Sequence, residues 1–297
     1  MSTAGHGALT RTKILKRQQA VSRAMEGVAW LAAFTAVAIL VVVVWSVARR
    51  GASQLSFDFL TKPQIAYDPT QPQGLANAFV GTFVIVAIAT AMALPFGILV
   101  AIYVNEFATR WIRNAIGLVL DLLQGVPAIV IGFFVFGLIV LPLHQQSALA
   151  ASFALAVMML PLVARTTIEV LKLVPSSLRE ASLGLGVPRW RTVVGVVLPQ
   201  SVGGTLTGVT LAVARVAGET APILFTSSLV ANGTSWNPTH ALMTVPLAIF
   251  ELSDQPDLPS QQRAWAAAFV LLMFILFASL AARWLATRSK RKLGRAR

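Results

Sequence analysis

Residues 180–199 read EASLGLGVPRWRTVVGVVLP, a polar and basic stretch punctuated by glycine. Long apolar segments precede and follow it. A loop of this kind between two membrane crossings is where a transporter can receive force from a soluble partner. The stretch therefore indicates both how the chain is organised and what kind of work it does.

The composition on either side of this stretch is that of a membrane protein. Hydrophobic residues make up 56% of the 297 residues and charged residues only 12%, whereas a soluble protein has about a quarter charged. Barrel strands would alternate in polarity over about ten residues, and these segments do not. The sequence predicts an all-α integral membrane protein with six transmembrane helices, because six apolar windows reach the roughly 17 residues needed to cross a bilayer: 28–48, 76–104, 115–142, 147–164, 203–225 and 264–285.

The distribution of Lys and Arg predicts the orientation, because cytoplasmic loops carry an excess of both. They gather in the N-terminal tail, after the second and fourth windows, and in the C-terminal tail, so we expect both termini and the loop around Glu180 in the cytoplasm of a bacterial cell. Ser46-Val47-Ala48 resembles a signal cleavage site, but the leader and the apolar run are too long, so a retained anchor is expected.

Several functional classes are disfavoured by the residue inventory. The net charge of +13 sits at membrane ends, where anionic lipid and topology account for it better than nucleic acid does. The chain has no cysteine and its three histidines are isolated, so we expect no metal site and no cofactor. It also lacks the phosphate loop G-x-x-x-x-G-K-[ST]. We therefore expect no enzyme activity in this chain, and any ATP must be hydrolysed by another polypeptide.

The chain divides by composition into two basic tails, a first helix and a denser core. Gln124 to Pro127 interrupts the third window, and such breaks occur where a helix lines a cavity or packs inside protein; both interpretations stay open. The expected parts are a cytoplasmic tail (1–27), the first transmembrane helix with its outward loop (28–74), the transport core (75–286) with a cytoplasmic coupling loop (165–199), and a second tail (287–297).

Two short helices are predicted in the cytoplasmic loop. Ser177 and Glu180 have the spacing of a capping box, so the first helix should run from Leu178 towards Gly186, which can end it in a left-handed conformation. Pro188 suits the first turn of a second helix, which should continue to Leu198. This arrangement would expose Arg179, Arg189, Trp190 and Arg191.

The fifth window contains a pair of charges on a face of small residues. Five residues fall within a sector about 80° wide at helical spacing: Gly204, Gly208, Ala212, Arg215 and Glu219. The small-x-x-x-small pattern permits close helix contact, and intramembrane charges are functional candidates. Either a structural salt bridge or contact with a translocated anion would explain the pair.

The cytoplasmic loop resembles the EAA signature of ABC importer permeases. Glu180, Ala181, Gly186, Leu198 and Pro199 stand at the positions of that motif, while Ser182 and Val196 are mild departures. The resemblance implies the type I importer permease fold and a loop that docks into a cytoplasmic ATPase subunit. The residues it implies for ATPase coupling are Glu180, Ala181, Gly186, Arg189, Leu198 and Pro199.

Three further segments resemble the phosphate branch of these permeases. They are Asn77–Glu106, Leu122–Phe134 (LLQGVPAIVIGFF) and the sequence Arg-x-x-Gly-Glu-Thr-Ala-Pro that begins at Arg215. The first part of the last motif is similar to oxyanion permeases in general, including those for sulfate and molybdate. The resemblance implies a translocation path lined by Arg215 and Glu219.

The same resemblance implies the partners of the chain. They are a second, homologous permease subunit, two ATPase subunits and an extracytoplasmic phosphate-binding protein. Two alternatives remain: a permease for molybdate or sulfate, and an ion-driven secondary carrier that needs no ATPase and often has inverted repeats.

Overall fold

The computed structural model describes residues 13–64, 74–227 and 233–294, and these contain helices and connecting loops but no strand. Parts of the two predicted tails, residues 1–12 and 295–297, lie outside the described residues, as do residues 65–73 of the predicted outward loop and residues 228–232. The chain forms two compact units, Met1–Arg49 and Arg50–Arg297. The first unit contains all but the last two residues of helix α1 (Lys13–Gly51), whose most apolar window is long enough to cross a membrane and has no buried residue.

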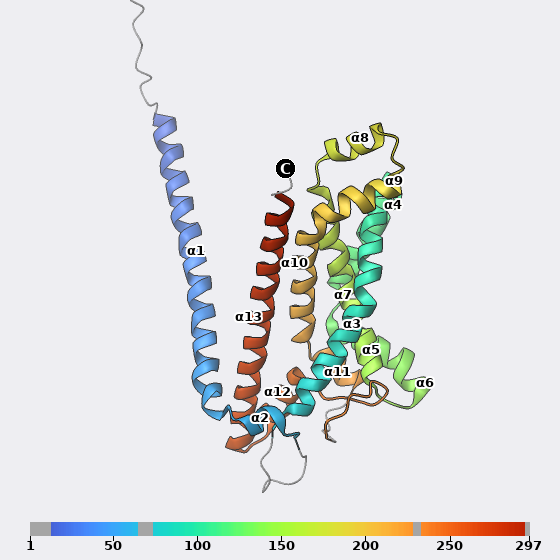
Figure 1. The fold of residues 1–297 in the computed structure, drawn as a ribbon. Helices are drawn as coiled ribbons and strands as arrows, with labels where there is room; N and C mark the ends of the chain where they lie inside the picture. The colour runs from blue at the N-terminus through green and yellow to red at the C-terminus, as the bar shows by residue number, and fades with distance from the viewer. Residues whose placement is uncertain (1–12, 65–73, 228–232, 295–297) are drawn as a thin grey trace, which may run out of the picture. The chain divides into compact units, whose positions relative to one another are not determined.

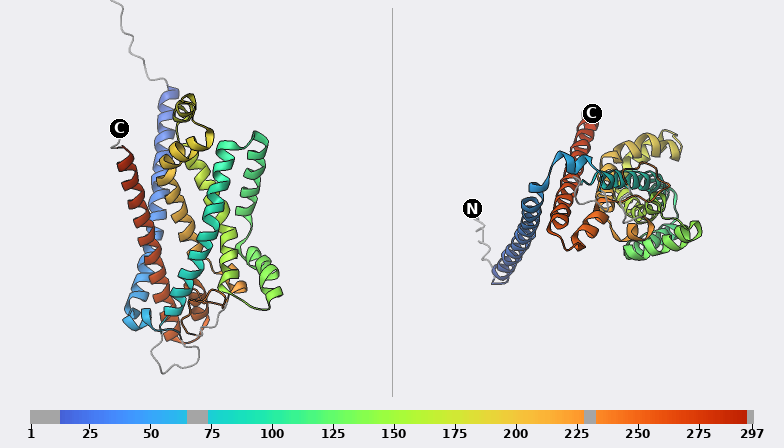
Figure 2. Two further views of the ribbon diagram at one scale, coloured as in Figure 1. Left: turned by 45° about the vertical axis from the view of Figure 1, so that its right-hand side comes forward. Right: turned by 90° about the horizontal axis from the view of Figure 1, so that it is seen from below.

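The second unit holds all the other elements (Figures 1 and 2). In chain order they are η1 (Ala52–Gln54), α2 (Phe57–Thr61), α3 (Ala76–Ile102), η2 (Tyr103–Phe107), α4 (Arg110–Gly125), α5 (Ala128–Val135), η3 (Phe136–Val140), α6 (Leu141–Leu143), α7 (Ala148–Lys172), α8 (Ser176–Gly184), α9 (Arg189–Thr192), η4 (Val193–Val197), α10 (Leu198–Ala217), α11 (Ala221–Thr226), α12 (Val245–Asp254) and α13 (Leu258–Gly294). Within this unit α8, the start of α4 and the end of α13 lie at one end, and α2 and α12 at the other.

The predicted all-α membrane class is confirmed, but the third window differs from the prediction. In the described chain, five helices are long and apolar enough to cross a membrane, and a sixth crossing requires a helix pair bent by 95°. This pair joins residues 110–125 to residues 128–143, so the window predicted at 115–142 is not one straight helix. Pro127 explains the break, because it disfavours a helical conformation at Val126, which has ψ 127.

Helix α7 lies at the centre of the second unit. It is rich in alanine, and its buried residues lie on several sides of the helix, among them Ala150, Ser152 and Leu155. A Cβ added at Gly97 of α3 would lie 2.8 Å from a methyl group of Val163, so α3 and α7 approach closely. Such contact through small residues is how membrane helices associate without a hydrophobic driving force.

The fifth predicted window is placed differently from the expectation of 203–225. A single helical run extends from Arg189 to Ala217, so the second loop helix does not stop at Leu198 but continues into the membrane as α10. The π segment η4 lies immediately before Leu198 and Pro199. Proline cannot donate the regular helical bond and its ring clashes with the preceding turn, which a local π segment accommodates.

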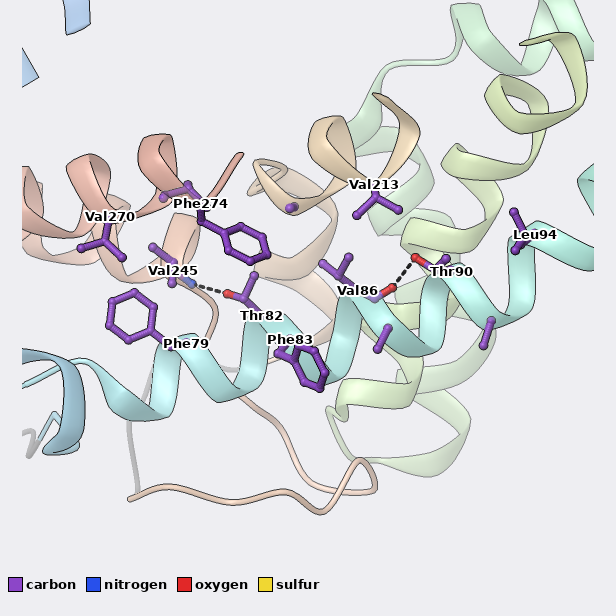
Figure 3. Close-up of a pocket in the computed structure, with 14 residues that line it drawn as sticks. Phe79, Thr82, Phe83, Val86, Thr90, Leu94, Val213, Val245, Val270 and Phe274 are labelled. Carbon is purple, nitrogen blue, oxygen red and sulfur yellow. Dashed lines mark hydrogen bonds between the residues drawn. The ribbon is translucent and has the colours of Figure 1, made fainter. Parts of the chain in front are cut away.

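An apolar hollow of about 590 Å³ opens between α3, α10, α12 and α13. Phe79, Phe83 and Phe274 lie around it (Figure 3). Its two threonine hydroxyls bond to backbone oxygens of their own helix, Thr82 to Ala78 and Thr90 to Val86. The hollow therefore presents an apolar wall with no free hydrogen-bonding group from these threonines.

Candidate functional site

Helices α8 and α9 form the predicted pair of short helices, and Gly186 separates them. Gly186 has φ +79, the left-handed region that glycine adopts most readily. Its amide donates to the carbonyl of Leu183, and the amide of Val187 donates to that of Ser182. This is a Schellman motif, which confirms that Gly186 ends the first helix by a left-handed turn.

The predicted capping box is wrong. Helix α8 begins at Ser176 with Pro175 as the N-cap residue, and no side chain caps it. Ser177 is therefore inside the first turn, and Glu180 is exposed in the middle of the helix. Pro175, with φ −56 and ψ 137, fixes the direction of the chain into the helix without a side-chain bond.

A buried hydrogen bond joins the two loop helices. The hydroxyls of Ser182 and Thr192 are 2.9 Å apart, and both residues are buried. The loop is thus a folded unit in which α8 is attached to the start of the long helix that contains α10.

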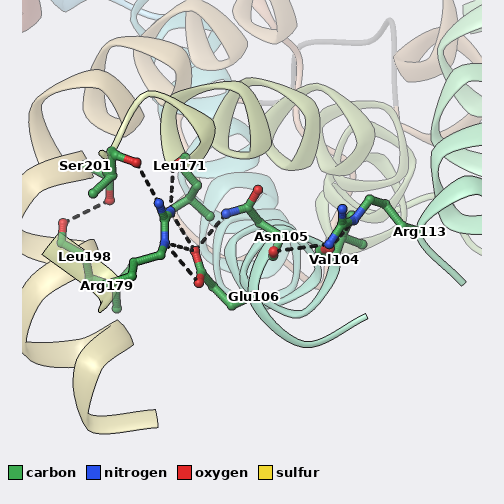
Figure 4. A network of polar contacts seen from close by, with 9 residues as sticks. Val104, Asn105, Glu106, Arg113, Leu171, Arg179, Leu198 and Ser201 are labelled. Carbon is green, nitrogen blue, oxygen red and sulfur yellow. Dashed lines mark hydrogen bonds and ion pairs between the residues drawn. The ribbon is translucent and has the colours of Figure 1, made fainter. Parts of the chain in front are cut away.

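The sequence predicts that Arg179 is exposed, but in the structure its side chain is largely buried (Figure 4). Its guanidinium contacts the Glu106 carboxylate at 2.9 Å and donates to the carbonyls of Leu171 and Val174 at 2.9 and 2.6 Å. Only 20% of the Arg179 side chain and 11% of the Glu106 side chain are exposed. Arg179 therefore anchors α8 to the ends of α3 and α7 and does not present its charge to a partner.

The remaining residues of the predicted coupling set lie on or near the surface of the loop. Glu180, Ala181, Gly186 and Arg189 are exposed, and Leu198 and Pro199 are half-buried at the start of α10. Trp190 and Arg191 are exposed as predicted. The loop therefore offers a mixed polar and apolar surface, formed by α8 and α9.

Arg215 and Glu219 meet at the end of α10. The Nε atom of Arg215 lies 3.9 Å from a carboxylate oxygen of Glu219, with 59% and 23% of the two side chains exposed. The helix ends at Ala217 and Gly218 is its C-cap residue, so the two charges do not lie on one continuous helix, although they remain close. Their pairing leaves room for a further ligand, because the guanidinium is more than half exposed.

The small-residue face of α10 packs against α7 as predicted. A Cβ at Gly204 would lie 2.6 Å from a Val170 methyl group, and one at Gly208 would lie 2.6 Å from the Thr166 hydroxyl. These contacts leave no space for a larger side chain. They fix the position of Arg215, which follows on the same face of the helix.

Helices α5 and α11 also meet. A Cβ at Gly132 of α5 would lie 2.5 Å from the Cα atom of Pro222 in α11. Glu219 lies between α10 and α11, just before this contact. The helix that follows the break at Gly125–Pro127 therefore packs on the helix that follows Glu219.

Sequence reasoning missed two ion pairs that involve residues far apart in the chain. One is Glu106 with Arg179, and the other joins Asp121 of α4 to Arg165 of α7. A signal for both existed, since Glu106 and Asp121 are acidic residues at the end of or inside apolar windows. No group of His, Asp and Glu within the described residues has a geometry suited to a metal ion.

Comparison with known proteins identifies the family to which this architecture belongs. The family model described as "Binding-protein-dependent transport system inner membrane component" matches residues 93–291. A phosphate transport system permease protein PstA from Yersinia pestis is 36% identical, with 84% of this chain and 85% of the relative covered. A PstA protein from Xylella fastidiosa is 35% identical over 93% and 96%, and a PstA 1 protein from Mycobacterium tuberculosis is 40% identical over 73% and 72%.

Solved structures share the fold at low sequence identity. A bacterial ABC transporter involved in alginate import aligns with a TM-score of 0.61 at 14% identity, covering 93% of this chain and 98% of the other. The MetNI methionine ABC transporter in an inward-facing conformation aligns with a TM-score of 0.56 at 16% identity, covering 73% and 94%. The fold is therefore that of a type I ABC importer permease, and the chain belongs to the family of binding-protein-dependent transport system inner membrane components, within its PstA branch of phosphate transport system permeases.

Proposed function

We propose that this chain is the permease subunit of an ATP-driven importer of inorganic phosphate and forms the translocation path together with a second permease subunit. The observation that carries the proposal is the Arg215–Glu219 pair at a helix break inside an apolar region. A planar guanidinium offers two directed hydrogen bonds to neighbouring phosphate oxygens. Glu219 competes for the same guanidinium and thereby allows the anion to leave.

The α8–α9 loop is the proposed contact with the ATPase subunits. Glu180, Ala181 and Arg189 offer an exposed surface, while Gly186, Leu198 and Pro199 shape the turn and the entry into α10. The buried Ser182–Thr192 bond supports transmission, because a force on α8 passes to the long helix. In this arrangement the chain itself hydrolyses no ATP.

The proposed complex contains a PstC-like permease subunit, two PstB-like ATPase subunits and a PstS-like phosphate-binding protein outside the cell membrane. Both termini and the α8–α9 loop face the cytoplasm, as the excess of Lys and Arg favours. The position of the end of α13 at the same end of its unit as α8 supports this orientation.

Uptake by the reconstituted complex tests the proposal. Vesicles with loaded binding protein should accumulate labelled phosphate when ATP is present, and an ion gradient alone should drive none. Excess molybdate or sulfate should not compete. Strong competition by either would assign the chain to another oxyanion, and gradient-driven uptake without ATP would assign it to the secondary carriers.

A further inference from the structure

Helix α4 carries a polar stripe along one side. Its members follow each other at intervals of four and three residues and fall within about 80° of the helix surface: Arg110, Asn114, Gly117, Asp121 and Gln124. Exposed apolar residues occupy another side of the same helix, among them Leu118, Val119 and Leu122. One exposed side of α4 is thus polar and another is apolar.

Helix α7 presents a matching stripe. Its members also follow each other at intervals of four and three residues and are half-buried or exposed: residues 158, 162, 165, 169 and 172. Their neighbours Met159, Val163 and Ala164 are buried. Towards its end the stripe is charged, with Arg165, Glu169 and Lys172. Glu169 and Lys172 pair with each other at 2.7 Å.

Polar contacts join the two stripes into one seam. Arg165 forms an ion pair with Asp121 and donates to the carbonyl of Gly117. One turn further along, the amide of Gln124 lies 3.4 Å from the carbonyl of Pro161. We call this contact line between α4 and α7 the polar seam.

The polar seam lies inside two candidate membrane-spanning segments, since α7 continues to Lys172, beyond the predicted window of 147–164 and into the predicted cytoplasmic loop of 165–199. Asp121 is eleven residues after the start of α4, which is about 16 Å along the helix axis. Arg165 is seven residues before the end of α7, which is about 10 Å along that axis. The hydrocarbon core of a membrane is about 30 Å thick. Yet 64% of the Asp121 side chain and 28% of the Arg165 side chain are exposed. Charges facing lipid at this depth cost free energy, so this side of α4 faces water or protein.

The Arg215–Glu219 pair and the polar seam lie at different levels along α7. Gly208 packs on Thr166 and Gly204 on Val170, so α10 runs antiparallel to α7. Arg215, seven residues beyond Gly208, is level with about residue 159 of α7, roughly 9 Å further from the end of α7 than Arg165 is. Arg165 is therefore nearer than Arg215 to the end of the unit that carries the α8–α9 loop, while α10 and α4 pack on sides of α7 that are about 100° apart.

We propose that the polar seam is an oxyanion site on the cytoplasmic half of the translocation path, where Arg165 binds the anion in exchange for Asp121. The inference rests on the proposed function, since it uses the same anion and the same direction of transport. In the state described here the carboxylate of Asp121 occupies the guanidinium. An arriving phosphate replaces it with two directed hydrogen bonds, and the carboxylate takes the guanidinium back when phosphate leaves.

The absence of cysteine from the chain permits a direct test. Gln124→Cys places a thiol in the seam, and Leu122→Cys places one at nearly the same depth about 160° around the helix. In the assembled, transport-competent complex, an anionic methanethiosulfonate should modify the first thiol at least about tenfold faster, because only a hydrated thiol ionises readily. Phosphate turnover should slow this reaction and leave the second unaffected. Modification is read as the mass shift of this chain.

Asn114→Cys with Ala115→Cys provides a second matched pair if Gln124→Cys does not assemble. Both residues are exposed and adjacent in sequence, but about 100° apart around the helix. Equal rates within a pair, or rates that phosphate does not change, would overturn the proposal. Equally slow rates would mean that a partner subunit covers the seam, which also overturns it.

Transport by variants of the ion pair is the complementary measurement. Arg165→Gln should lower the maximal rate of phosphate uptake while the KM for loaded binding protein stays unchanged, and Asp121→Asn should do the same because the anion is released slowly. The double variant should be as slow as Arg165→Gln. Recovery in the double variant would show that the pair is only a structural bridge.

If wild-type complex fails to take up phosphate, the proposed function fails. If wild-type complex takes up phosphate while the labelling test fails, only the proposal for the polar seam is refuted.

Discussion

Glu106 of η2 and Arg179 of α8 are 73 positions apart in the sequence, yet their side chains form an ion pair at 2.9 Å. The amide of Asn105 donates to the same carboxylate at 2.7 Å. Arg179 thereby uses its donors on the carboxylate and on two backbone carbonyls of the α7 end. The α8–α9 loop is thus attached to η2 and to the end of α7, besides the helix that it continues into.

Glu106→Gln should destabilise the assembled chain. Removing one partner leaves the other charge largely buried, which costs about 3–5 kcal/mol for a buried pair. The measurement is the thermal unfolding midpoint of the purified complex. Glu169→Gln is the matched control, because the exposed Glu169–Lys172 pair should contribute about 0–1 kcal/mol. Equal midpoints for the two variants would contradict the assigned anchor.

Gly186→Pro should uncouple phosphate uptake from ATP hydrolysis. Proline fixes φ near −65°, whereas this position has φ +79, so the turn between α8 and α9 must change. Gly186→Asn is the control, since asparagine tolerates the left-handed region and a Cβ here meets no atom within 4 Å. Uptake and ATPase stimulation by loaded binding protein are measured together, and wild-type values for the proline variant would refute the role of the turn.

Gly208→Val should prevent the packing of α10 on α7. The added side chain would overlap Thr166, whose hydroxyl would lie 2.6 Å from the new Cβ. We expect a marked loss of assembled complex in the membrane, quantified by immunoblot after purification through a partner subunit. Gly195→Val serves as the control, because no atom lies within 4 Å of a Cβ there. Normal assembly of Gly208→Val would show that the two helices can separate.

Arg215→Gln should abolish phosphate uptake without loss of assembly, because the amide lacks the charge that attracts the anion. Glu219→Gln should impair release more than complex formation. Both are measured as uptake per assembled complex, together with the double variant. Since an ion pair with a purely structural role can often be replaced as a unit at little cost in stability, substantial recovery in the double variant would identify a structural bridge and reject the direct role.

Local chemistry explains which features the sequence predicts. Gly186 and Pro188 impose backbone conformations on their own positions. The apolar windows are recognised from the hydropathy of their own residues, without knowledge of any partner. The break at Val126–Pro127 is visible for the same reason, but its angle is not, because hydropathy is equal for a straight crossing and for two segments at 95°.

Long-range partners account for what the sequence does not predict. Arg179 carries no signal of burial until Glu106 is placed beside it, and Asp121 resembles an isolated charge until α7 supplies Arg165. The capping box fails for a related reason, since Pro175 directs the chain into α8 before Ser177 is reached. The roles proposed for Arg215, Glu219 and the coupling residues stay predictions.

The helix that contains α10 turns a small rotation into a displacement at a distance. The run from Arg189 to Ala217 bends between α9 and the part of α10 that packs on α7 (Figure 1), so only the packed part acts as a straight rod. Between Gly204 and Arg215 this part measures about 16 Å at 1.5 Å per residue. Tilting it by about 5° around Gly204 moves Arg215 by roughly 1.4 Å, at the rise of the same helix. That distance exceeds the margin between a hydrogen bond and no bond, so in the proposed path a change of a few degrees in the tilt of α10 is enough to connect or disconnect Arg215 from an anion.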